Sequence, residues 1–170
     1  NSFLAETKTR HEDWSDEKID EVAEKLTMAT LKFEMIKVSA EKIITFNIKE
    51  ALRFEGYTAA YLQYSCARIN SVLAKAGDWI ISTEAMHFTE TAEKNLVVAL
   101  AKYPEVIAEA AGKYEPSILT QYLFDVAQLF SDFYQTCPIL SAAEEVKNSR
   151  LALAGHAQRV LVAGLATIGI

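Results

Sequence analysis

Apolar residues at helical spacing are the feature that most constrains what this chain can fold into. Only three prolines and six glycines interrupt the 170 residues, and long runs between them repeat every three or four positions. The clearest run extends from Thr58 to Ala76, and its apolar positions are Tyr61, Leu62, Cys66, Ile69, Val72 and Leu73. The chain after residue 57 is therefore predicted to form an all-α helical bundle.

Capping residues and prolines predict where the helices begin and end. Ser15 is a suitable cap for a first helix, and Pro116 suits the first turn of a later one. Leu31 to Val38 fits either a strand or a helix, and we interpret it as helix. The expected helices span 16–29, a short stretch from Asn47 to Phe54, 58–76, Thr89 or Thr91 to Tyr103, 104–113, 116–137, and about 141–169 with a bend near Ser149.

The net charge of −6 argues against a nucleic-acid binder, because such proteins are often basic. Eleven of the 23 acidic residues, however, lie in the first fifty positions, which leaves nine basic against twelve acidic residues in the remainder. Binding depends on where charges lie locally, so the overall balance does not exclude nucleic acid.

Residues that carry out chemistry are scarce. The three histidines are far apart, and the sequence has no Cys-x-x-Cys pair, no His-x-x-x-His pair and no glycine-rich phosphate loop. The two cysteines are expected to be reduced thiols of a cytoplasmic protein. The most apolar stretch, 151–170, contains His156, Gln158 and Arg159, so a membrane span is not expected. These features favour a binding module over a catalytic domain.

One segment resembles a known family. Phe46 to Gly56 runs directly into Tyr57 to Ile69, and this resembles the junction between catalytic core and anticodon-binding domain in arginyl-tRNA synthetases. Tyr57 departs from the family pattern, which usually has a polar residue there. Later stretches at 114–134 and 149–170 resemble the central and final helices of the same domain. The positions that match the junction motif are Tyr61, Leu62, Gln63, Tyr64, Ala67 and Arg68.

The resemblance implies a C-terminal fragment in two parts. Residues 1–57 would be the helical end of the catalytic domain, and residues 58–170 the DALR-type anticodon-binding domain. The parent enzyme would attach arginine to its tRNA with ATP and magnesium, whereas this fragment would be inactive alone and bind no cofactor or metal. The implied partners are arginine tRNA, through its anticodon loop, and the catalytic domain of the same chain, with no DNA and no membrane.

The candidate RNA-binding residues are Tyr61, Tyr64, Arg68 and Tyr134. On a helix, the first three share one face, where two rings and a guanidinium suit unpaired bases and a phosphate. The resemblance adds Tyr134 as a second stacking platform. Tyrosines at helical spacing are also common in protein cores, so core packing is an alternative for each ring.

Three further basic residues, Lys75, Arg150 and Arg159, suit either phosphate contacts or ordinary solvated surface positions, and we favour the second interpretation. The whole chain also has an alternative interpretation, as a stand-alone helical module that binds tRNA or protein partners.

Overall fold

The computed structural model describes residues 8–9, 14–53, 55–77 and 86–170, and the described part contains helices and no strands. The predicted all-α bundle is therefore confirmed. The long helices begin and end close to the predicted positions. In chain order they are α2 (Asp16–Ile36), α3 (Ile48–Ala51), α4 (Ala59–Ala76), α5 (Thr91–Ala101), α6 (Tyr103–Lys113), α7 (Pro116–Thr136) and α8 (Glu144–Thr167).

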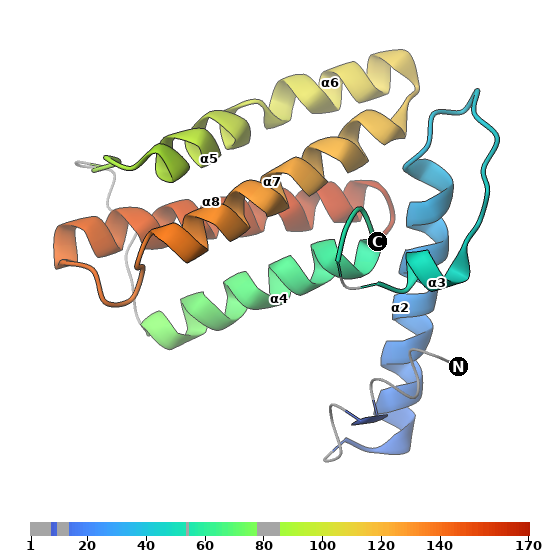
Figure 1. Ribbon diagram of the computed structural model, residues 1–170, viewed down its shortest axis with the longest axis horizontal. Coiled ribbons are helices and arrows are strands. Elements are labelled where there is room, and N and C mark those ends of the chain that lie inside the picture. The colour runs from blue at the N-terminus through green and yellow to red at the C-terminus, as the bar shows by residue number, and fades with distance from the viewer. Residues whose placement is uncertain (1–7, 10–13, 54, 78–85) are drawn as a thin grey trace.

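Helix α7 is at the centre of the bundle (Figure 1). It packs against α8, against α5 and α6 on one side, and against α4 on the other. Apolar residues three and four positions apart give α7 a stripe that is buried along its whole length. This stripe consists of Leu119, Tyr122, Leu123, Val126, Ala127, Phe130 and Phe133. The core of the domain thus lies around one amphipathic helix, and α4 and α7 run side by side in the same direction.

Helix α2 lies across one end of the bundle, steeply inclined to α4, α7 and α8 (Figure 1). Its buried Phe33 packs edge-to-face on Tyr57, with ring centroids 5.2 Å apart. Lys32 donates a hydrogen bond of 2.6 Å to the Gly169 carbonyl beyond α8. Contacts from both the middle and the end of the chain therefore hold α2 on the bundle. The boundary expected between residues 57 and 58 stays a prediction.

Several helix ends differ from the prediction. The ambiguous stretch 31–38 continues α2 as far as Ile36, as interpreted. The break before Pro104 lies one residue earlier than expected, so Tyr103 begins α6 instead of ending α5. Proline fits there because the first turn of a helix leaves its N–H groups unbonded. The short helix capped by Asn47 ends at Ala51, and Phe54 lies outside the described residues. Helix α8 is continuous through Ser149.

Gly164 allows α7 and α8 to approach closely. A Cβ atom at this position would meet the side chain of Leu123, which is fully buried on α7. A larger residue could fit only if Leu123 moved. Across the ranges that the structure describes, no helix combines the length and the apolar character that a membrane span requires.

Candidate nucleic-acid interface

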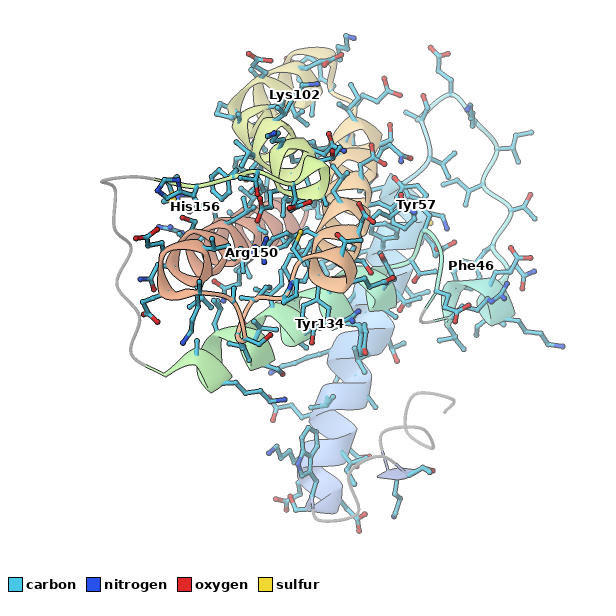
Figure 2. All side chains as sticks on the ribbon, turned by 60° about the vertical axis from the view of Figure 1, so that its left-hand side comes forward. Phe46, Tyr57, Lys102, Tyr134, Arg150 and His156 are labelled. Carbon is cyan, nitrogen blue, oxygen red and sulfur yellow. The ribbon has the colours of Figure 1, made fainter. Side chains whose placement is uncertain are left out.

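Arg68 on α4 and Tyr134 on α7 meet on the surface where the two helices run side by side. The guanidinium carbon of Arg68 lies 4.2 Å from the centroid of the Tyr134 ring, well within the range of a cation–π contact. The Tyr134 ring in turn packs against the Phe130 ring, with 6.2 Å between the two centroids. Figure 2 shows Tyr134 where α7 passes over α4. A buried ring thus supports an accessible stack of one ring and one guanidinium.

Tyr64 lies one helical turn before Arg68 and is open to solvent. Its side chain is 49% exposed, and that of Tyr134 is 37% exposed. Such exposure is high for two large aromatic residues, since rings of this size normally bury most of their surface. The structure therefore places Tyr64, Arg68 and Tyr134 within reach of a ligand on one side of the bundle. Their role in RNA binding stays a prediction.

Tyr61 occupies a different environment from Tyr64. Its ring is half-buried and packs edge-to-face on Phe124 of α7, with centroids 5.4 Å apart. Burial raises the pKa of the Tyr61 phenol, and the nearby Arg68 opposes this shift. Tyr61 thus helps to join α4 to α7, and its ring is less available to a ligand than that of Tyr64. Phe130, from the buried stripe of α7, contacts Tyr134, and the partly buried Phe124 contacts Tyr61; neither was predicted as a site residue.

The three additional basic residues have separate locations. Lys75 and Arg159 are exposed, in agreement with the solvated surface charges that we favoured. Arg159 lies beside His156, with a nitrogen-to-nitrogen distance of 3.4 Å. Arg150 is neither solvated nor available to a phosphate, which corrects both interpretations of it. It is buried in an ion pair with Glu93, and helical spacing alone could not show this because the partner is 57 residues away.

The residues at this surface are not of the types that commonly bind metal ions. Across the described ranges, no three His, Cys, Asp or Glu residues come together as metal ligands. The residues at the α4–α7 surface are rings and a guanidinium, which can stack on bases and pair with anions but offer no nucleophile, base and orienting group together.

Comparison with known proteins agrees with this picture. The family described as the DALR anticodon binding domain matches residues 62–170. The chain belongs to this family.

The relatives that it matches are synthetases. It is 38% identical over 164 residues to the arginine–tRNA ligase of Thermococcus kodakarensis. This match covers 92% of this chain and 26% of that protein. It is 40% identical over 152 residues to the arginine–tRNA ligase of Clostridium botulinum, covering 89% of this chain and 27% of that one. The resemblance inferred from the Tyr61–Arg68 motif is confirmed.

A solved structure shares the fold. The arginyl-tRNA synthetase of Thermus thermophilus superposes with a TM-score of 0.88 at 33% identity, over 99% of this chain and 29% of that chain. The chain thus spans about a quarter of the length of the curated relatives named above.

Proposed function

We propose that this chain is the tRNA-binding part of an arginine–tRNA ligase and that it holds the anticodon loop of arginine tRNA on the α4–α7 surface. The observation that carries the proposal is the stack of Arg68 on Tyr134, next to the exposed Tyr64. The anticodon loop has unpaired bases, and proteins that read RNA loops stack such bases on aromatic rings and on arginine.

The proposed mechanism is recognition without a covalent step. Tyr64 and Tyr134 offer their exposed ring surface to bases, while the Arg68 guanidinium, 4.2 Å from the centroid of Tyr134, offers N–H groups to a base edge or a phosphate. Because Arg68 is already held against a neighbour, less side-chain entropy is lost when it binds. Tyr61 contributes mainly by keeping α4 against α7. The bound loop would be held in a fixed position relative to the rest of the enzyme.

The chemical step is proposed to take place in the remainder of the parent protein. ATP and magnesium would be bound there, because the described residues contain no cluster of metal ligands and the sequence contains no glycine-rich phosphate loop. The chain alone is therefore expected not to attach arginine to tRNA. The cytoplasmic location of the protein stays a separate prediction. Arginine transfer by the isolated chain in the presence of ATP would contradict this part of the proposal.

An apolar face of α2 is the proposed contact with that remainder. Met28, Leu31 and Met35 lie on the side of α2 opposite Phe33, and all three are exposed. The segment that follows adds exposed Ile43, Ile44, Phe46 and Ile48, and Figure 2 shows Phe46 to the right of α2, away from the bundle. An exposed apolar patch of this kind indicates a contact surface. The curated relatives have about three times as much additional chain to cover it.

A titration with arginine tRNA tests the RNA proposal directly. Tyr134→Ala and Tyr64→Ala should each weaken binding by about fivefold to a hundredfold, the range for losing one base–aromatic stack. The matched control is Tyr114→Ala, because Tyr114 is 91% exposed and lies just before α7, whose first residue is about 27 Å along the helix from Tyr134.

The same titration should use arginine tRNA with an altered anticodon loop. The native chain should bind this RNA more weakly, and the two site variants should lose most of the preference. Equal affinity for both RNAs would point instead to a module that binds tRNA without reading the anticodon. If the chain binds neither RNA in a salt-sensitive manner, only the alternative of a module that binds protein partners remains.

A further inference from the structure

A buried ion pair joins three segments of the bundle that are far apart in the sequence. Arg150 of α8 donates from Nε to Oε1 of Glu93 on α5 at 2.6 Å, and from Nη1 to the carbonyl of Pro138 at 2.7 Å. The side chains of Arg150 and Glu93 are 9% and 0% exposed. Figure 2 shows Arg150 among the helices, in contrast to the surface position of Tyr134.

Glu93 uses its second oxygen as well. Oε2 accepts hydrogen bonds from the backbone N–H groups of Thr89, at 2.8 Å, and Glu90, at 2.9 Å, at the start of α5. Both carboxylate oxygens therefore have partners. The free energy lost when two charges are removed from water is about as large as the free energy gained from their attraction. A buried ion pair therefore adds little to stability, and its main effect is to fix the relative position of the helices that carry it.

The Pro138 carbonyl lies two residues beyond the end of α7, whose last turn carries Tyr134. Within this end of α7, the backbone N–H of the C-cap residue Cys137 donates to the Phe133 carbonyl, and the Thr136 hydroxyl donates to the Asp132 carbonyl. The bond from Arg150 is thus a side-chain tether on the backbone where the chain leaves α7.

We propose that Arg150 is a positioning residue, which through Pro138 and Glu93 sets the last turn of α7 so that the Tyr134 ring meets Arg68. The effect on RNA binding rests on the function proposed above, whereas the effect on the Arg68–Tyr134 stack does not. Arg150 itself touches no RNA, because it is buried.

Arg150→Lys tests the inference. Lysine keeps a positive charge for Glu93, but a single ammonium cannot occupy both donor positions of the guanidinium. The stack is observed by proton NMR, because the Tyr134 ring current shifts the Arg68 Hδ resonances upfield. We expect this shift to fall in Arg150→Lys while the chain stays folded, and the dissociation constant for arginine tRNA to rise about fivefold. In the Tyr134→Ala background, Arg150→Lys should have no further effect on affinity.

Ser149→Ala is the matched control. Ser149 is the neighbouring buried residue on α8, and its hydroxyl accepts a hydrogen bond of 3.1 Å from the His87 N–H, so it too ties α8 to the segment before α5. Within the described residues, the Ser149 hydroxyl forms no hydrogen bond to the end of α7. The Arg68 shift and the affinity for tRNA should both be unchanged in this variant.

The outcomes separate the two proposals. An unchanged Arg68 shift in folded Arg150→Lys, or losses of affinity that add in the double variant, would overturn the positioning role. If the native chain bound no tRNA, or if Tyr134→Ala did not alter affinity, the proposed function would fail while the NMR shift still decided the role of Arg150. If Arg150→Lys does not fold, Glu93→Gln tests the same tether, with the same expected and overturning results.

Discussion

The hydroxyl of Tyr57 lies 2.6 Å from Oγ1 of Thr120, so the residue just before α4 is hydrogen-bonded to the first half of α7. The Tyr57 ring also packs on Phe33 of α2, at 5.2 Å, and on Phe124 of α7, at 5.1 Å. Lys37 at the end of α2 donates to the Tyr57 carbonyl. Tyr57 therefore joins α2 to the bundle through its ring, its hydroxyl and its backbone carbonyl.

Removing the hydroxyl should weaken this joint without dismantling it. Tyr57→Phe keeps the ring contacts and loses one part-buried hydrogen bond, so we expect a loss of about 1 kcal/mol in the free energy of unfolding, measured by urea denaturation. Thr120→Val removes the other partner, and the double variant should lose less than the sum of the two single losses. Strictly additive losses would show that the two hydroxyl groups do not depend on each other.

Tyr57 and Tyr122 should lose their phenol protons only at strongly alkaline pH. Burial raises the pKa of Tyr57 to about 12 and that of Tyr122 to about 12, from an ordinary value of 10.0. Because the folded state favours the neutral phenol, stability is fully present below pH 10 and is lost as pH rises toward 12. Tyrosinate absorbance should therefore show a late phase that Tyr57→Phe reduces. A late phase of unchanged size in Tyr57→Phe would contradict this assignment.

Gly164 and Gly112 offer a matched pair of helical glycines. Gly164→Ala would force a Cβ atom into the buried Leu123, so overpacking of about 1–3 kcal/mol should outweigh the gain in helix propensity, about 1 kcal/mol at most. Gly112→Ala meets no atom within 4 Å and should be neutral or stabilising. Thermal unfolding should rank the melting temperatures with Gly112→Ala at or above the native chain and Gly164→Ala below it. The reverse order would show that α7 and α8 are not closely packed at Leu123.

The apolar face of α2 should make the isolated chain bind hydrophobic dyes. Met35→Glu places a charge in the middle of this face and should lower the fluorescence of bound anilinonaphthalene sulfonate and any self-association seen by sedimentation. Val98→Glu is the control, because Val98 on α5 is as exposed as Met35, at 56% against 58%, but lies on another helix. Equal effects of the two substitutions would mean that α2 has no special contact surface.

The helices could be predicted because their information is local. The apolar spacing, the prolines at 104 and 116 and the caps at Ser15 and Thr58 act within a few residues, and the helices begin within about three residues of the predicted positions. The motif from Tyr61 to Arg68 also carries its family resemblance in one continuous segment. For the same reason, the fold class and the family were accessible without coordinates.

Tertiary structure decided what covers each helix face. Tyr61 and Tyr64 both lie on α4, yet Phe124 covers much of the first ring and leaves the second open. Arg150 has the sequence surroundings of a surface residue, but Glu93 and Pro138, 57 and 12 residues away, enclose it. Helical spacing determines the direction of a side chain relative to its own helix, whereas burial and pairing depend on distant segments that only packing brings together.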